Sequence, residues 1–449
     1  MAALMPRSER PLRIAVIGTG IAGLSAAWLL AQRHDVQVFE KDTRIGGHCN
    51  TVDADGVPVD TGFIVYNETT YPNLTALFRH LDVPTKPSDM SFAVSLDDGR
   101  LEYAGTDLFG LFAQPRNLVR PRFWAMLYDL RRFYRNAPRD VAALGLAGLD
   151  EYLAAGGYGA ALRDDHLYPM AAAIWSTPVA EIGRYPAAAF IRFCDNHGLL
   201  RLRDRPVWRT VDGGSREYVA RLTRSFAGRI AAGRAASRIR RAAAGVEIVD
   251  ALGHAATFDH AVIATHADQA LALLADPSEE ERALLGAFGY NENMAVLHRD
   301  PALMPRRRAA WASWNYISRQ VGASRHLSVT YWMNRLQDIP DETPLFVTLN
   351  PEREPDPSRV IRADIYHHPR YDAGAMVAQE RLWSLQGQRN TWFCGAHFGA
   401  GFHEDGLQSG LAVAEQLGGV RRPWSVPDES SRIFIAPTAA LSPAFEPAA

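Results

Sequence analysis

The chain has 449 residues, of which 47% are hydrophobic and 22% are charged, and its formal net charge is -2. This length predicts more than one packed core, and the near-neutral charge gives none of the basic excess that nucleic-acid-binding proteins show. Three widely spaced cysteines, Cys49, Cys194 and Cys394, argue against a disulfide framework and favour a reducing compartment. No apolar run approaches the roughly 20 residues of a membrane span, and residues 1–11 lack the apolar core of a signal peptide. We expect a cytoplasmic protein that stays in solution or lies peripherally on the inner face of a membrane.

The first 40 residues predict a strand, a glycine turn and a helix that together bind a dinucleotide. A strand at 12–17 leads into Gly18-x-Gly20-x-x-Gly23, an apolar helix follows, and the next strand ends on Glu40. Gly18 permits the tight turn, Gly20 lets the backbone approach a diphosphate, and Gly23 lets the helix pack on the strand. The helix N-terminus faces the phosphates, and Glu40 accepts hydrogen bonds from the ribose. An ordinary glycine turn in an α/β core would have to combine all these features by chance.

The order of elements predicts an α/β protein with two domains. One is a Rossmann-type, doubly wound domain, and the other is an inserted α+β substrate domain that carries an antiparallel sheet. The nucleotide-binding domain is discontinuous and comprises residues 1–85, 206–285 and 386–422. The substrate domain comprises residues 86–205 and 286–385. Residues 423–449, rich in proline, serine and alanine, predict a loosely ordered tail.

Two alternating segments in the second insert predict a pair of antiparallel strands at 309–317 and 327–333. Trp314 and Tyr316 share one face of the first strand, and Tyr331 lies on a face of the second. Such aromatic faces either line an apolar pocket or form ordinary core, and the core interpretation is favoured.

A second glycine-rich turn at 394–410 leads into another helix near the end of the chain. The positive N-terminus of that helix can stabilise the negative charge of a reduced flavin ring. The run Arg44-x-Gly46-Gly47 adds a cation and a further close approach of the backbone beside the diphosphate. NAD would need only the first glycine turn, so the pattern favours FAD.

The whole pattern, to about residue 420, resembles the flavin amine oxidoreductase superfamily, which includes monoamine and polyamine oxidases, protoporphyrinogen oxidase and carotenoid desaturases. Four runs are similar to a bacterial branch of predicted NAD/FAD-binding proteins that is associated with cyclopropane-fatty-acid-synthase-like methyltransferases. Members of that branch have been implicated in desaturating methylated acyl chains on the way to furan fatty acids. The four runs are Tyr71-Pro72-Asn73-Leu74, Val211-Asp212-Gly213-Gly214-Ser215, Trp311-Ala312-Ser313-Trp314-Asn315-Tyr316 and Gly401-Phe402-His403-Glu404-Asp405-Gly406.

The resemblance implies a non-covalent FAD and a set of residues around it. The ADP half would be held by Gly18, Gly20, Ile21, Ala22, Gly23, Glu40, Lys41, Arg44, Gly46, Gly47 and His48, with Arg44 reaching toward the phosphates and the backbone near Ile239 meeting adenine. The other cofactor-binding candidates are Gly62, Phe63, Thr265, Gly395, Phe402, Glu404, Asp405, Gly406 and Leu407.

Two departures from the family pattern are visible. Ala396 replaces the acidic residue that often follows the glycine at the position of Gly395, so its hydrogen bond to the ribityl chain is lost or moved. The amine oxidases commonly place a lysine near flavin N5, but neither Lys41 nor Lys86 matches that position.

The expected reaction removes a hydride from a substrate C–H bond to flavin N5, and desaturation also needs a base near the ring. His403, Glu404 and His397 lie in the turn that meets the flavin in relatives, and Tyr66 follows the strand expected beside the ring; these four are the catalytic candidates. Simple hydrogen bonding to the backbone is the competing interpretation for a histidine in a glycine turn. His367 and His368 point in opposite directions on a strand, so no metal site is expected.

Residues 114–140 combine seven arginines with apolar residues at helical spacing. Such a helix either lies on anionic lipid or packs its apolar stripe into the core, and the core interpretation is favoured. The stripe comprises Phe123, Met126, Leu127, Leu130, Phe133 and Tyr134.

The leading hypothesis is an FAD-dependent desaturase or oxidase that acts on methylated fatty acyl chains of membrane lipids. The expected partners are a hydrophobic substrate, a membrane surface met through residues 114–140, and a lipid methyltransferase; nucleic acid is not among them. The alternatives are a soluble FAD amine oxidase that produces hydrogen peroxide, an isomerase that uses reduced FAD without net turnover, and a non-catalytic flavoprotein partner of the methyltransferase.

Overall fold

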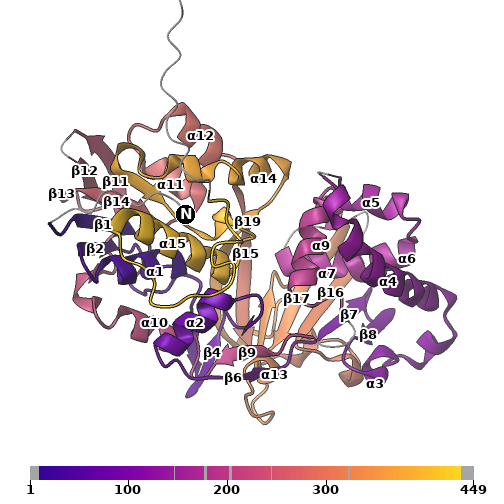
Figure 1. Cartoon of the computed structure of the whole chain (residues 1–449). Coiled ribbons are helices and arrows are strands. Elements are labelled where there is room, and N and C mark those ends of the chain that lie inside the picture. The colour runs from indigo at the N-terminus through magenta and orange to yellow at the C-terminus, as the bar shows by residue number, and fades with distance from the viewer. Residues whose placement is uncertain are drawn as a thin grey trace, which may run out of the picture.

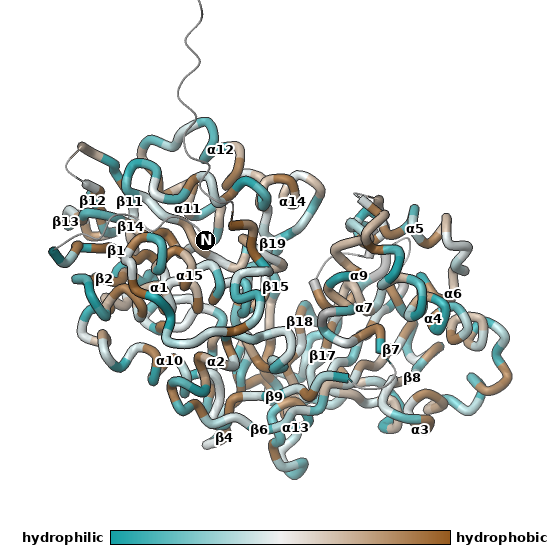
Figure 2. Tube along the Cα trace, viewed as in Figure 1, coloured by the Kyte–Doolittle hydropathy of each residue, from teal (hydrophilic) through white to brown (hydrophobic). Residues whose placement is uncertain are grey.

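The computed structural model describes residues 10–435, except for residues 146, 176–178, 202–204, 244 and 322–323. Figure 1 shows two domains side by side, with the N-terminal helix α1 in one and the helices α4, α5, α6, α7 and α9 in the other. Figure 2 shows hydrophobic segments within both of them. The predicted class, a Rossmann-type domain combined with a domain built on an antiparallel sheet, is confirmed.

The core of the nucleotide-binding domain is a five-stranded parallel sheet with the order β10-β2-β1-β14-β20. The strands are β1 (Arg13–Ile17), β2 (Asp35–Phe39), β10 (Ile230–Ala231), β14 (His260–Ile263) and β20 (Thr391–Phe393). Their branched and aromatic residues, such as Ile14, Val16 and Ile17, are buried because helices cover the sheet. The carboxyl ends of β1, β2, β14 and β20 therefore meet at one edge, where ligands of such sheets bind.

Helices α1 (Ile21–Leu30) and α15 (His403–Gly418) pack against each other beside this sheet. Their contact depends on glycine, because a Cβ at Gly410 would lie 2.2 Å from the carbonyl oxygen of Ala22. A Cβ at Gly406, in the first turn of α15, would lie 2.9 Å from Cγ2 of Ile21, the first residue of α1. The N-terminal ends of the two helices are thus neighbours.

Smaller elements surround this core. An antiparallel sheet is formed by β11 (Ala236–Ala242), β12 (Gly245–Asp250) and β13 (Ala255–Phe258). Two small sheets are formed by β3 (Thr51–Ala54) with β4 (Val57–Asp60), and by β5 (Tyr66–Asn67), β9 (Trp208–Val211) and β6 (Thr85–Ser88). The helices of this half are α2 (Pro72–His80), α10 (Arg216–Thr223), α11 (Ala267–Leu273), α12 (Glu279–Leu285) and α14 (Ala373–Gln379). Helix α14 lies within the range 286–385 predicted for the substrate domain, but it packs on α12 and its Ala375 and Ala378 join the core of this half.

The substrate domain contains a seven-stranded sheet with the order β19-β15-β18-β17-β16-β7-β8. The strands are β7 (Phe92–Leu96), β8 (Leu101–Ala104), β15 (Gly289–His298), β16 (Trp314–Val321), β17 (Ser324–Trp332), β18 (Phe346–Leu349) and β19 (Val360–Arg370). All neighbours are antiparallel except β16 and β7. The predicted strand pair is present with Trp314 opposite Tyr331, but its boundaries were wrong: residues 308–310 form a 3₁₀ turn and Met333 begins helix α13 (Met333–Leu336).

Among the described residues, seven α-helices lie between β8 and β9, namely α3 (Leu108–Leu111), α4 (Pro121–Asp140), α5 (Leu149–Ala155), α6 (Ala160–Leu162), α7 (Tyr168–Trp175), α8 (Val179–Ile182) and α9 (Ala187–Asn196). On α4, Phe123, Met126 and Phe133 are at most 2% exposed and belong to the core of this domain. The apolar stripe of residues 114–140 is therefore core, as favoured, and does not face lipid. Among the described residues no helix is long and apolar enough to cross a membrane.

The prediction of a loosely ordered tail is wrong for residues 423–435. Trp424 stacks on Trp28 with 5.9 Å between ring centroids, Ile433 is buried, and Arg432 pairs with Asp405. These contacts with the nucleotide-binding domain hold the segment in place. Residues 436–449 of the predicted tail lie outside the described residues.

Replacing Gly410 by alanine is expected to lower the free energy of unfolding by about 3 kcal/mol, because the new methyl group would overlap the backbone of α1. Denaturant unfolding of the variant and the parent measures this difference. Gly228→Ala is the matched control, because a Cβ there meets nothing within 4 Å in the described part of the chain. Equal losses in both variants would contradict the packing argument.

Candidate functional site

The turn between β1 and α1 has the geometry that a bound diphosphate requires. A Cβ at Gly23 would lie 2.0 Å from the carbonyl oxygen of Gly18, and one at Gly47 would lie 2.9 Å from Cα of Gly20. By contrast, a Cβ at Gly20 would meet no atom of the described chain within 4 Å. No side chain among the described residues caps the N-terminus of α1 at Gly20. Open space beside unpaired N–H groups at a helix N-terminus suits an anion, so these residues fit the diphosphate of a dinucleotide.

Glu40 is held beside this turn at the end of β2. One carboxylate oxygen accepts hydrogen bonds from the backbone N–H of Thr19 at 2.9 Å and from its hydroxyl at 2.5 Å, and the other accepts from the N–H of Asp42 at 3.0 Å. Glu40 is only 8% exposed. The oxygen that accepts from Asp42 keeps a free acceptor site, so the fixed carboxylate can still bind a ribose hydroxyl.

The two cationic side chains that were predicted near the phosphates have local partners in the structure. The guanidinium of Arg44 donates to the carbonyl oxygens of Gly47 at 2.8 Å and Cys49 at 2.9 Å, so it closes the glycine loop that it belongs to. Lys41 is exposed and lies 3.6 Å from the carboxylate of Asp42. Both positions follow from local partners that the sequence pattern did not reveal.

The second glycine turn meets the first at the same edge of the sheet. The N–H of Gly395 donates to the hydroxyl of Ser409 at 3.0 Å, and a Cβ at Gly395 would lie 3.5 Å from the carbonyl oxygen of Thr265 and 2.6 Å from the ring of His397. Gly406 adjoins Ile21, and Leu407 is fully buried behind it. The predicted residues that follow β14 and β20 therefore lie close to those at the start of α1 and α15.

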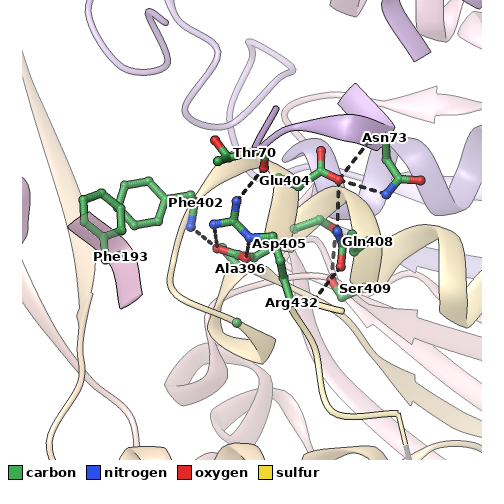
Figure 3. A network of polar contacts seen from close by, with 12 residues as sticks. Thr70, Asn73, Phe193, Ala396, Phe402, Glu404, Asp405, Gln408, Ser409 and Arg432 are labelled. Atoms are coloured by element: carbon green, nitrogen blue, oxygen red, sulfur yellow. Dashed lines mark hydrogen bonds and ion pairs between the residues drawn. The ribbon is translucent and has the colours of Figure 1, made fainter. Parts of the chain in front are cut away.

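Figure 3 shows how two buried carboxylates fix the start of α15. Asp405 accepts the N–H of Phe402 at 2.7 Å and pairs with the guanidinium of Arg432 at 2.6 Å. Glu404 accepts the N–H and side-chain amide of Asn73, at 3.0 and 2.8 Å, and the N–H of Leu74 at 2.9 Å, and so binds the N-terminus of α2. Burial raises the pKa of both carboxyl groups. The contacts of Glu404 are those of a helix cap, which favours a positioning role over that of a base.

His403 forms a compact cluster with two residues that the sequence analysis missed. Its Nε2 lies 2.7 Å from the hydroxyl of Tyr218 and 3.2 Å from Sγ of Cys49, and its ring stacks on Phe63 at 3.8 Å. Burial lowers the pKa of His403 to about 3, so the ring is neutral at physiological pH. Tyr218 lies on α10, 185 residues away in sequence, and no local motif links it to His403.

A group of histidines surrounds His48. Its ring lies 5.2 Å from that of Tyr366, 5.7 Å from that of His368 and 6.4 Å from that of His266, measured between centroids. The pKa of His48 is well below its usual value because of burial and then the positive charges that His368 and His266 can carry. The adjacent Gly62 is required by packing, since a Cβ there would lie 2.1 Å from the carbonyl oxygen of His48.

Three predicted residues lie apart from the His403 cluster. Tyr66 packs on Phe78 at 5.2 Å and lines a cavity of about 480 Å³ that none of the other catalytic candidates line. His397 is 3% exposed, its Nε2 has no partner in the described part of the chain, and burial lowers its pKa to about 3. Ile239 is buried in β11, and its carbonyl accepts the N–H of Ala275 at 2.9 Å.

An aromatic cluster joins α15 to the substrate domain. Phe402 stacks on Phe193 of α9 at 4.7 Å, and His197 stacks on Phe193 at 4.0 Å and on Trp208 at 5.9 Å. Nδ1 of His197 donates to the carbonyl oxygen of Phe193 at 2.9 Å, and burial lowers the pKa of His197 to about 3. Nε2 of His197 is therefore a buried hydrogen-bond acceptor. Nδ2 of Asn67, which lies opposite Trp208 in the sheet, is a buried donor. Neither atom has a hydrogen-bond partner among the described residues. Unpaired buried polar atoms of this kind mark positions for water or a ligand.

Comparisons with known proteins agree with the fold. Residues 16–81 match the NAD(P)-binding Rossmann-like domain family. The chain is 32% identical over 158 residues to the zeta-carotene-forming phytoene desaturase of Myxococcus xanthus, which covers 33% of the chain and 30% of the desaturase. It is 48% identical over 52 residues to a 4,4'-diapophytoene desaturase of Staphylococcus aureus, covering 11% of the chain and 10% of that enzyme. The chain thus aligns with less than a third of the length of these two relatives.

Solved structures match over almost the whole chain. The CLA-producing fatty acid isomerase from P. acnes has a TM-score of 0.63 at 17% identity, covering 90% of this chain and 97% of the isomerase. Putrescine oxidase bound to putrescine has a TM-score of 0.65 at 12% identity, covering 91% and 99%. Cyclohexylamine oxidase from Brevibacterium oxydans has a TM-score of 0.62 at 17% identity, covering 90% and 99%. The chain has the fold of the flavin oxidases, with a Rossmann-type FAD-binding domain.

Gly20→Val is expected to abolish retention of FAD while it changes the stability of the cofactor-free protein by less than about 1 kcal/mol, because the new side chain enters open space. Flavin absorbance per protein after purification, and denaturant unfolding without FAD, measure the two effects. Retention of FAD by the variant would exclude the space beside Gly20 as the diphosphate position.

Acid is expected to destabilise the fold through its buried histidines. The pKa values of His166, His197 and His397 are lowered to about 4, 3 and 3. Below pH 6.5 the unfolded chain binds protons that the folded chain does not, so this stability is complete above about pH 6.5 and is lost as the pH falls toward these values. At pH 5 each group costs about 2 kcal/mol.

His397→Phe is expected to reduce the loss of stability between pH 7.5 and pH 5 by about 2 kcal/mol relative to the parent. Urea unfolding at the two pH values, at equal FAD saturation, measures it. Identical pH dependence in both proteins would show that His397 is not held neutral by the fold.

Proposed function

We propose that this protein is an FAD-dependent oxidoreductase whose substrate is a fatty acyl chain, methylated in the leading case. The observation that carries the proposal is the convergence of two helix N-termini, those of α1 and α15, at the carboxyl edge of the parallel sheet, directly beside an aromatic cluster. FAD, when bound, supplies the acceptor for a hydride. The desaturases among the sequence relatives and the fatty acid isomerase among the structural neighbours support this choice.

The residues at the sheet edge would bind and orient the cofactor. The space at Gly20 and the N–H groups of α1 suit the diphosphate, and the fixed carboxylate of Glu40 suits the ribose. The start of α15 would direct its positive end at the flavin, since Asp405 and Glu404 hold that turn in place. Binding the diphosphate in this way needs no cationic side chain. This agrees with Arg44, whose guanidinium donates to the carbonyl oxygen of Gly47 in its own loop.

The aromatic cluster favours an apolar substrate over an amine. Phe193, His197 and Phe402 offer stacked rings, and the carboxylate of Asp405, which accepts the N–H of Phe402, is already paired with Arg432. A protonated carboxyl group would suit this pair, because its O–H can donate to Nε2 of His197 and its carbonyl oxygen can accept from Nδ2 of Asn67. An acyl chain combines both properties.

His403 is the proposed proton acceptor for desaturation. Its ring is neutral, and the hydroxyl of Tyr218 at 2.7 Å can pass on or return a proton. A methyltransferase that supplies methylated acyl chains is the proposed partner in the cell.

The test is an anaerobic titration of the FAD-loaded protein with phospholipids that carry methylated acyl chains. Bleaching of the flavin band at about 450 nm is expected with these lipids and not with putrescine or aromatic amines. Bleaching by amines alone would identify an amine oxidase, and a double-bond shift without net flavin reduction would identify an isomerase.

His403→Gln is expected to slow flavin reduction by the lipid about 10²- to 10⁴-fold while FAD stays bound. Stopped-flow absorbance measures the rate, and His254→Gln, at an exposed position between β12 and β13, serves as the histidine control. A reduction rate unchanged in His403→Gln would exclude it as the base. Retained function of a reduction-dead variant in cells would instead support a non-catalytic flavoprotein partner.

A further inference from the structure

One end of the substrate domain combines exposed apolar side chains with arginines. It consists of α3, the 3₁₀ turn Pro115–Val119 and the first turns of α4, and we call it the α3–α4 face. Its exposed large apolar residues are Leu108 (72% exposed), Phe109 (85%), Leu118 (53%), Val119 (81%), Trp124 (49%) and Tyr128 (68%). These are six of the thirteen such side chains that the described residues expose, within a stretch of 21 positions. Such clustering marks an interaction surface, whereas scattered exposed residues do not.

The fold holds these side chains outward. The indole N–H of Trp124 donates to the carbonyl oxygen of Leu118 at 2.8 Å, which ties α4 to the preceding turn. The ring of Phe112 packs on that of Trp124 at 5.9 Å, and the carboxylate of Asp107 caps α3 by accepting the N–H of Gly110 at 2.7 Å. The opposite side of α4 is already buried in the core. The exposed residues therefore belong to a fixed second face of the same segment.

Arginines without acidic partners border the apolar residues. Arg116 and Arg120 donate to the carbonyl oxygens of Gly99, at 3.1 Å, and Arg100, at 3.0 Å. Neither has a carboxylate within 4 Å in the described part of the chain. Burial is the largest cause of the lowered pKa of Arg120, followed by the charges of Arg116 and Arg100, while Asp165 acts in the opposite direction. Arg100, Arg116 and Arg120 thus lie close together in a chain whose net charge is -2.

We propose that the α3–α4 face docks on the surface of an anionic phospholipid bilayer. Phe109 and Val119 enter the apolar boundary, Trp124 and Tyr128 lie at headgroup level, and Arg116 and Arg120 meet lipid phosphates. Charge complementarity favours this occupant over a second protein, since the cations flank the apolar residues and lack carboxylates of their own. Docking requires no chemistry, so its failure would leave the proposed oxidoreductase activity unaffected.

The first experiment measures co-sedimentation of the FAD-loaded protein with vesicles of phosphatidylglycerol and phosphatidylcholine in equal parts, and with phosphatidylcholine vesicles alone. Binding is expected on the anionic vesicles. Arg116→Gln with Arg120→Gln is expected to weaken it about thirtyfold, from about 1 kcal/mol for each charge. Phe109→Ser with Val119→Ser is expected to weaken it at least tenfold. Leu252→Ser with Val377→Ser, at exposed apolar positions elsewhere, is the matched control and is expected to bind like the parent.

A second experiment reports insertion directly. The three native cysteines are buried, so Phe109→Cys and Leu252→Cys each provide one accessible thiol for an environment-sensitive fluorophore. A blue shift with anionic vesicles is expected at position 109 and not at 252. Equal shifts at both positions, or vesicle binding that the α3–α4 variants leave unchanged, would overturn the proposal. Disruption of a dimer or of a bound protein by those variants, with vesicle binding intact, would identify a protein interface in its place.

Discussion

The close packing of α1 on α15 is the constraint on which the rest of the site depends. Gly410 lets the backbones approach until a single methyl group would overlap the carbonyl of Ala22. This approach places Gly406 against Ile21, so that two helices distant in sequence begin side by side at one edge of the sheet. Two helix N-termini at one place produce a positive potential that suits an anionic dinucleotide. The site is therefore made chiefly of backbone, which explains why Arg44 and Lys41 are free to serve other contacts.

Burying carboxylates at the start of α15 requires partners from elsewhere in the chain. Asp405 obtains Arg432 from the C-terminal segment, and Glu404 obtains the N-terminus of α2 and the side chain of Asn73. An unpaired carboxylate at this depth would cost several kcal/mol, so the segment beyond residue 422 completes the helix start. The proline-rich composition of this segment suggested a loose tail. Composition alone cannot predict that Arg432 pairs with the buried carboxylate of Asp405.

The parts of the site that follow from local sequence were predictable. The glycine turn, Glu40 and the parallel strands can be recognised in short stretches of sequence, because each glycine is required by close contacts with its immediate neighbours. The cluster of Cys49, Tyr218 and His403 was not predictable, because its three members come from separate elements and no spacing rule connects them. The same holds for His48 with His266 and His368, which meet only through the pairing of β15 with β19 and the end of β14.

Helix α4 shows that periodicity alone does not decide whether a face packs on the core or meets another apolar environment. A stripe at helical spacing identifies which residues share a side, but either side of an amphipathic helix can meet an apolar environment. Here the regular stripe is satisfied by the core, and Trp124 and Tyr128 fall outside it because they are spaced for the opposite side. Large apolar residues that stay exposed are therefore the better indication of a binding surface, because an exposed aromatic ring contributes little to the stability of the fold.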